Sequence, residues 1–425
     1  MPHNVLHIVC HDLGQELYCY GNGTIPSPTL DALGQEGVRF TNYFGASTPC
    51  SPSRGCIMTG KYAHSNGLIG LVNRGWDLPE AETTLVDCLN DAGYHTANIG
   101  LQHERKDPDQ NRYAHRWSES NDAKRVAEQV EAYLEDVPTP FYINAATSEV
   151  HLEFDRPHYT FDEPDSVELP PYLPDTPEVR LERARFHGAI RYLDEAVGMM
   201  LEALERTGHR DDTIVVFTTD HGAAFPRAKS TLYDAGIGTA LLMRFPEGYQ
   251  GVREELLSNI DLMPTLLDAL GIEIPAGVQG RSFLGALSGG AYEPRDVVFS
   301  EKNFHDHYDP VRAVRTERYK YIRSYIEQPK IALPKDIENS IASKTLRPDA
   351  NEPRLPEELY DLETDPHEED NLIDNPALAE VRARLSDALD AWMVDTNDPL
   401  LERVDLPYPP EQYSDREPPV VKSIQ

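Results

Sequence analysis

Short runs of apolar residues alternate along the chain with stretches in which apolar positions recur every three or four residues. The apolar runs are rich in β-branched side chains and predict buried parallel strands at residues 5–10, 95–99, 141–146, 213–219 and 240–245. The stretches with the longer period predict amphipathic helices at residues 85–92, 123–134, 179–206 and 257–270. This alternation is typical of an α/β fold in which helices sandwich a mostly parallel sheet.

The alternation of strands and helices changes after about residue 293. Apolar runs predict strands at residues 297–300, 313–315 and 319–325. A final helix is predicted at residues 376–394, whereas residues 328–356 show no periodic pattern. We therefore predict a large N-terminal domain, residues 1–292, and a smaller C-terminal subdomain, residues 293–425, with an antiparallel sheet and a helix. Residues 155–176 are rich in proline and acidic side chains and predict a long surface loop at the rim of a site.

The composition is that of a folded and strongly acidic protein. Hydrophobic residues make up 40% of the 425 positions, which is enough for a large core. The formal net charge of -33 argues against binding to nucleic acid or to an anionic membrane surface. No run reaches the roughly 20 apolar residues of a membrane helix. Five cysteines without a CxxC pair, and an N-terminus without a leader pattern, predict a reducing, cytoplasmic location.

Polar residues follow the predicted strands at their carboxyl ends, where ligands gather in open parallel sheets. In chain order they are His11 with Asp12, His103, His151, and Asp220 with His221. Carboxylates and imidazoles together are typical ligands of a divalent metal. Each pair also has a simpler explanation, because Asp12 could cap a helix and Asp220-His221-Gly222 could form an ordinary turn.

The segment Cys50-Ser51-Pro52-Ser53-Arg54 combines a thiol with a cation where a helix over residues 53–59 is predicted to begin. Free N–H groups and the helix dipole favour an anion at such a position, and Arg54 would add positive charge. Taken alone, these five residues are explained more simply by a buried cysteine in a turn and an arginine in a surface ion pair.

Seven segments that follow one another along nearly the whole chain resemble type I sulfatases, the formylglycine-dependent family, and especially their heparan N-sulfatase (N-sulfoglucosamine sulfohydrolase) branch. They read NVLHIVCHDLG, CSPSRGCIMTG, HSNGLIGL, LPPYLPDTPEVR, DDTIVVFTTDHGAAFP, NIDLMPTLLDALGI and ELYDLETDPHEEDNL. The resemblance implies an alkaline-phosphatase-like fold and the hydrolysis of a sulfate ester or a sulfamate, such as that of a sulfated sugar.

The resemblance also implies a set of metal ligands. Asp12, Asp220 and His221 would bind one divalent metal together with Cys50, after a formylglycine-generating enzyme has oxidised Cys50 to formylglycine. Most sulfatases have an aspartate pair at the first strand end, but here His11 precedes Asp12. The resemblance implies Ca²⁺, and the imidazole of His11 makes Mn²⁺ and Zn²⁺ alternatives to it.

Catalytic roles are implied for five residues. Cys50 would provide the nucleophile, and Arg54 would hold both the modified side chain and the sulfate. His103 would deprotonate the second hydroxyl of the hydrated aldehyde, and His151 would protonate the leaving group. Lys229 lies where the branch carries a basic contact to the sulfate.

One cation that the family usually has is missing. The Gly-Lys-x-His element after the second strand reads Gly100-Leu101-Gln102-His103 here, so Leu101 replaces the lysine. A preorganised contact of this kind contributes about 3 kcal/mol to transition-state stabilisation. Candidates to replace it are Arg105, Lys106 and Arg227. The segment that approaches the leaving group in sulfatases offers further polar residues, namely His305, Asp306, His307 and Arg312.

Two other functions fit the same residues. A phosphate ester, diester or phosphonate could be hydrolysed at this site, because its transition state shares the in-line geometry and the spread of charge over equatorial oxygens. Alternatively, the chain could bind sulfated ligands without cleaving them, an idea motivated by His11 and Leu101. In each case the expected ligand is a small anionic molecule, and the sequence makes no prediction of the oligomeric state.

Overall fold

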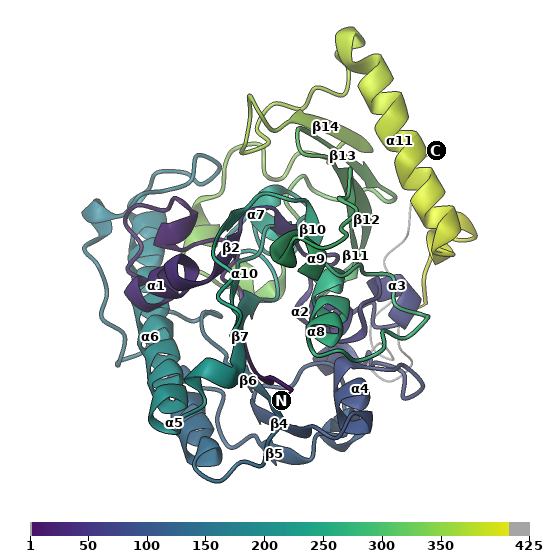
Figure 1. Ribbon diagram of the computed structural model, residues 1–425. Helices are drawn as coiled ribbons and strands as arrows, with labels where there is room; N and C mark the ends of the chain where they lie inside the picture. Colours follow the sequence, from purple (N-terminus) through teal and green to yellow (C-terminus); the bar gives the residue numbers. More distant parts are fainter. Residues whose placement is uncertain (1, 408–425) are drawn as a thin grey trace.

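A computed structural model describes residues 2–407, with a large sheet at the centre and a small sheet beside it (Figure 1). The large sheet has eight strands in the order β5-β4-β6-β1-β7-β8-β2-β9. Four adjacent strands of this sheet are parallel and match predicted apolar runs: β4 (His95–Gly100), β6 (Phe141–Ala146), β1 (Asn4–Cys10) and β7 (Thr213–Thr219). All residues of β1, β6 and β7 are buried, which explains their continuous apolar character.

The fifth predicted strand runs in the opposite direction to the prediction. β8 (Leu241–Arg244) pairs antiparallel with β7, so its assignment as a parallel strand over residues 240–245 was wrong. A parallel pair needs a crossover that returns along the sheet, usually through a helix. The connection from β7 to β8 contains only one helix, the four-residue α7 (Asp234–Ile237). The chain therefore re-enters the sheet at the carboxyl end of β7, where it left. The short strands β2 (Val38–Phe40), β9 (Gly251–Arg253) and β5 (His115–Trp117) complete the sheet.

Helices cover both faces of the large sheet (Figure 1). One layer contains α1 (Pro28–Glu36), α5 (Ala123–Leu134) and α6 (Pro177–Arg206). The other contains α2 (Cys50–Thr59), α4 (Leu85–Asp91) and α8 (Leu262–Ala269). The two layers receive alternate residues of β1, because successive side chains of a strand point to opposite faces. The predicted α/β fold is therefore confirmed.

The helix predicted over residues 257–270 begins later than expected. Leu257–Ser258 forms strand β10, which pairs with β3 (Tyr43–Phe44), and Asn259–Asp261 forms a 3₁₀ turn before α8. The Asp261 carboxylate accepts a hydrogen bond from the Ser258 N–H, so a capping box marks this start.

The small sheet is antiparallel, as predicted, in the order β11-β12-β13-β14. Its strands are β11 (Val298–Phe304), β12 (Tyr308–Arg315), β13 (Tyr319–Ser324) and β14 (Glu357–Asp361), of which β14 was not predicted. Helix α11 (Ala379–Asp395) covers the sheet with Leu385, Leu389 and Trp392 (Figure 1). The subdomain boundary at residue 293 stays a prediction, and residues 408–425 lie outside the described residues.

Two irregular segments differ in their relation to the site. Residues 328–356 contain α10 (Lys335–Glu338) and a 3₁₀ turn, Ala342–Thr345, and α10 contributes to the pocket described below. Residues 155–176 form an irregular loop with one 3₁₀ turn, but they contribute no residue to that pocket. Tyr159, Tyr172 and Leu173 instead bury this loop against the layer that contains α6.

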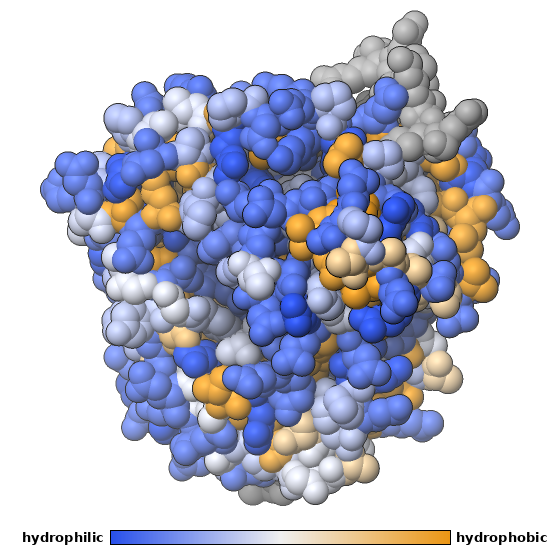
Figure 2. All heavy atoms as spheres, turned by 90° about the horizontal axis from the view of Figure 1, so that it is seen from above, coloured by the Kyte–Doolittle hydropathy of each residue, from blue (hydrophilic) through white to orange (hydrophobic). Residues whose placement is uncertain are grey.

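The surface agrees with the acidic composition. The face seen in Figure 2 is mostly hydrophilic, and its hydrophobic residues form small separate patches. Within residues 2–407, no helix has the length and apolar character needed to cross a membrane.

Candidate functional site

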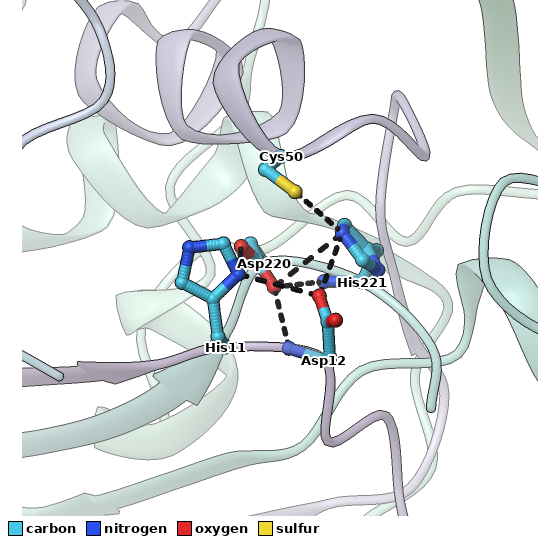
Figure 3. A group of neighbouring side chains, drawn as sticks. All are labelled: His11, Asp12, Cys50, Asp220 and His221. Carbon is cyan, nitrogen blue, oxygen red and sulfur yellow. Dashed lines mark hydrogen bonds and ion pairs between the residues drawn. The ribbon is translucent and has the colours of Figure 1, made fainter. Parts of the chain in front are cut away.

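Five polar side chains converge at the carboxyl ends of β1 and β7 (Figure 3). Cys10 of β1 pairs with Thr219 of β7, so the residues that follow the two strands lie side by side. The first turn of α2 brings Cys50 to the same place. One ligand atom from each side chain lies within 4.8 Å of the others, and all five residues are buried. The structure thus brings together the whole predicted metal set: His11, Asp12, Cys50, Asp220 and His221.

The contacts of His221 show why the cluster of five side chains is suited to bind a cation. Its Nδ1 lies 3.0 Å from the carbonyl oxygen of Gly222, which can only accept, so Nδ1 carries the proton. The lone pair of its Nε2 then faces the Asp12 Oδ1 at 3.2 Å and the Cys50 Sγ at 3.2 Å. A lone pair that faces a buried carboxylate is repulsive, and a shared metal ion removes this repulsion.

Charges around the group keep its ligands in the forms that bind metal. Burial alone would raise the pKa of Asp12, but nearby positive charge, that of the Lys229 ammonium first, outweighs burial and holds this pKa well below its usual range. Burial lowers the pKa of His11 to about 4, so its imidazole is neutral at neutral pH. The His11 Nδ1 lies 3.0 Å from the Asp220 Oδ2 and 3.3 Å from the Asp12 Oδ1.

The thiol of Cys50 is a poor nucleophile in this environment. Burial raises its pKa well above the usual value, and the carboxylates of Asp220 and Asp12 add to this, although Lys229 opposes them. A protonated thiol reacts slowly because the thiolate is the nucleophilic form. The position at the start of α2 suits an attacking group, but the unmodified side chain does not.

A pocket of about 290 Å³ opens over this cluster. Of the predicted catalytic residues, Cys50, His103, His151 and Lys229 line it. Arg54 lies behind them: it is buried, and it donates from Nε to the Asp220 Oδ2 at 3.3 Å and from Nη2 to the Cys10 carbonyl at 3.2 Å. Arg54 therefore positions Asp220, a candidate metal ligand, directly.

Asp336 is a site residue that sequence reasoning missed. Its Oδ2 lies 2.5 Å from the Lys229 Nζ and 3.4 Å from the His151 Nε2, and it lines the pocket. The Lys229 Nζ also contacts the Asp12 Oδ2 at 2.6 Å, so Lys229 links the candidate metal cluster to α10. The surrounding sequence, PKDIE, is an ordinary polar stretch far from the other site residues in the chain, and no local pattern points to it.

Two cations proposed to replace the lysine lost at Leu101 lie elsewhere. Arg105 donates to the Leu78 carbonyl oxygen at 2.9 Å. Arg227 donates to the His367 carbonyl oxygen at 2.8 Å, and its guanidinium stacks on a tyrosine ring. Neither of them, nor Lys106, lines the pocket, whereas Leu101 does.

Only part of the segment expected near the leaving group, residues 305–312, reaches the pocket. His305 and Asp306 line the pocket, but His307 does not. Arg312 is fully buried in the small sheet, where it donates to Asp398. Arg312 is therefore a structural residue and not a substrate contact.

Comparisons with known proteins place this geometry in a family. The family model described as Sulfatase matches residues 3–272, and the one described as N-sulphoglucosamine sulphohydrolase, C-terminal, matches residues 224–342. An ulvan-active sulfatase of Formosa agariphila is 30% identical over 93% of this chain and 75% of its own. N-sulphoglucosamine sulphohydrolase of Homo sapiens is 29% identical over 94% of this chain and 91% of its own.

The fold agrees with these matches. A solved structure of a protein in complex with its substrate, D-glucosamine-2-N,6-O-disulfate, superimposes with a TM-score of 0.77 at 18% identity, over 95% of this chain and 100% of its own. The sulfatase model covers more than half of the chain, and the two relatives match nearly all of it. The chain therefore belongs to the sulfatase family of sulfuric ester hydrolases.

Proposed function

We propose that this protein hydrolyses the sulfate ester or sulfamate of a sugar through a formylglycine made from Cys50. The observation that carries the proposal is the place of Cys50: it begins α2, lines the pocket and lies 3.2 Å from a metal-ligand imidazole, yet its raised pKa makes the thiol unreactive. Oxidation to an aldehyde, which forms a hydrate, would supply one oxygen to attack sulfur and a second to expel the product. This maturation requires a formylglycine-generating enzyme as a partner.

The donor set supports one divalent metal, held by His11, Asp12, Asp220 and His221 with the modified Cys50. Two imidazoles beside two carboxylates favour Mn²⁺ or Zn²⁺ over Ca²⁺, which prefers oxygen ligands. A bound cation would polarise a sulfuryl oxygen and lower the pKa of the attacking hydroxyl.

Three side chains would act on the substrate. The His151 Nδ1 donates to the Leu152 carbonyl oxygen at 2.6 Å, which leaves Nε2 to deliver a proton to the leaving group. The Lys229 ammonium would contact a sulfate oxygen. Burial lowers the pKa of His103 to about 3, so its imidazole is neutral and can take the proton from the second hydroxyl as sulfate departs.

A cysteine variant tests the proposal. Cys50→Ala should abolish hydrolysis of p-nitrophenyl sulfate, whereas Cys19→Ala, which changes a half-buried thiol outside the pocket, should retain it. Mass spectrometry of the peptide that contains Cys50 should show the aldehyde or its hydrate in protein from the native host. Near-normal hydrolysis by Cys50→Ala, or unmodified thiol alone in an active preparation, would contradict the mechanism.

The apolar Leu101 favours a second candidate, a phosphate or phosphonate ester hydrolase. Leu101 lines the pocket where the family usually carries a sulfate-binding lysine, and phosphoryl transfer shares the in-line geometry and the spread of charge over equatorial oxygens. Catalytic efficiencies on p-nitrophenyl sulfate and p-nitrophenyl phosphate separate the two functions. Binding of a sulfated sugar without turnover, by protein with fully modified Cys50, would instead identify a non-catalytic binder.

We also propose a reducing, cytoplasmic location for this protein. The support is that all five cysteines are free thiols, and four of them are buried.

A further inference from the structure

One wall of the pocket lies beside the small sheet, and a single buried carboxylate, that of Asp306, holds this wall together. The Asp306 Oδ1 accepts hydrogen bonds from the Arg74 Nε at 3.0 Å and Nη2 at 2.5 Å. Its Oδ2 accepts from the backbone N–H of Lys335 at 2.8 Å and bonds the His305 Nδ1 at 3.0 Å. Asp306 therefore holds three chain segments together, and each places a residue in the pocket lining.

Two cationic side chains, Arg74 and Lys335, lie at this wall, and they differ in whether a carboxylate pairs with them. Arg74 is tied to Asp306, but 37% of its side chain is still exposed. Lys335 begins α10, lines the pocket, and its ammonium forms no ion pair or hydrogen bond within residues 2–407. Lys229, by contrast, is neutralised by Asp12 and Asp336 at 2.6 Å and 2.5 Å.

The unpaired charge of Lys335 is unusual in this chain. Acidic residues outnumber basic ones 72 to 39, so carboxylates are plentiful as partners for a lysine. Its acidic neighbour Asp336 faces Lys229 and His151 instead. The wall carries a fixed positive charge that no carboxylate of the described chain neutralises.

We propose that Lys335, with Arg74 beside it, binds a second anionic group, a sulfate, on the leaving-group sugar. This inference rests on the proposed function, which places the scissile sulfate at Cys50 and Lys229 in the same pocket. A volume of about 290 Å³ matches a ligand of about one sugar unit. In such a ligand the scissile sulfate would contact Lys229, and the second anionic group would contact Lys335. Charge-assisted hydrogen bonds are the contacts that such a group would form with lysine and arginine.

The test compares substrates that differ only in the second charge. Glucosamine N-sulfate, its 3-O- and 6-O-sulfated forms and p-nitrophenyl sulfate are assayed with the full-length enzyme, Lys335→Gln and Lys344→Gln. The wild type should prefer at least one disulfated sugar by about tenfold or more in kcat/KM. Lys335→Gln should lose this preference and keep its turnover of p-nitrophenyl sulfate. Lys344→Gln, which changes an exposed lysine outside the pocket, should behave like the wild type.

A binding measurement separates this inference from the proposed function. Titration calorimetry with glucosamine and its 3- and 6-sulfates needs no turnover, and the wild type should bind one sulfated form about tenfold more tightly, whereas Lys335→Gln should not. If no substrate is hydrolysed but this difference in binding is found, the proposed function fails and the second anion site stands. If the wild type shows no preference in either assay, or Lys335→Gln keeps it, the site is refuted.

Discussion

His11 changes the character of the metal site at the scale of a single residue. Its neutral imidazole adds a second nitrogen donor to a candidate metal cluster that otherwise offers two carboxylates, His221 and Cys50. Nitrogen donors strengthen binding of Mn²⁺ and Zn²⁺ and contribute little to Ca²⁺, which prefers oxygen. We therefore expect His11, which departs from the usual aspartate pair, to influence which metal binds.

Replacement of His11 by aspartate should reverse this selectivity. We expect the wild type to bind Mn²⁺ or Zn²⁺ more tightly than Ca²⁺, and His11→Asp to shift the ratio of affinities toward Ca²⁺ by about tenfold or more. Calorimetric titration of each metal, with metal content after dialysis, measures this without turnover. His95→Asp, which changes an exposed histidine, is the control. A wild type that prefers Ca²⁺, or a variant with an unchanged ratio, would show that His11 does not select the metal.

At the scale of an element, the loop after β7 positions two candidate metal ligands, and Gly222 allows the backbone of this loop to pack closely. The Gly222 N–H donates to the Gly236 carbonyl oxygen at 2.8 Å, and the Gly222 carbonyl accepts from His221. A Cβ on Gly222 would lie 1.9 Å from the Ala235 carbonyl oxygen, so an alanine there must displace the loop. The backbone that carries Asp220 and His221 moves with it.

Gly222→Ala should therefore damage the metal site and the stability together. We expect a loss of about 1 to 3 kcal/mol in the free energy of unfolding and at least about a tenfold loss in metal affinity. Urea unfolding and metal titration measure the two effects. Gly23→Ala is a matched control, because its Cβ would meet only a Glu168 oxygen at 4.0 Å, and it should change stability by less than about 0.5 kcal/mol. Equal behaviour of the two variants would mean that the loop absorbs the methyl group.

Elements that are buried or long could be predicted from the sequence, and short ones could not. β1 and β7 are apolar throughout because both faces are covered, and α5 carries a clear apolar stripe over the predicted residues. α10 and β14 have four and five residues, too few to show a period. The same limit hid Asp336 and Lys335, which reach the pocket through tertiary packing, whereas strand-end residues such as His11 follow from sheet topology.

At the scale of the whole molecule, the small sheet shares a hydrophobic core with α2 and with loops of the large domain. Ala46, Cys56 and Ile260 from the large domain pack with Phe304 and Val314 of the small sheet. A polar connection accompanies this core. The Lys320 ammonium of β13 lies 2.8 Å from the Glu368 Oε1, and the Glu368 Oε2 accepts from the N–H of Asp234, where α7 begins. Glu368 thus joins the small sheet to the loop that follows the site.

Ionisation of the buried Glu368 should lower the stability of the folded protein as the pH rises. Burial and, less strongly, the charge of Asp234 raise its pKa from 4.5 to about 7, although Lys320 opposes them. Because the folded pKa exceeds the unfolded one, the stabilisation is complete below about pH 4.5 and is lost as the pH passes 7. Glu368→Gln stays neutral, so the stability of the wild type relative to this variant should fall by about 2 kcal/mol between pH 5 and pH 8. Urea unfolding at both values measures it, with exposed Glu369→Gln as control, and a difference that stays constant or grows with pH would contradict the assignment.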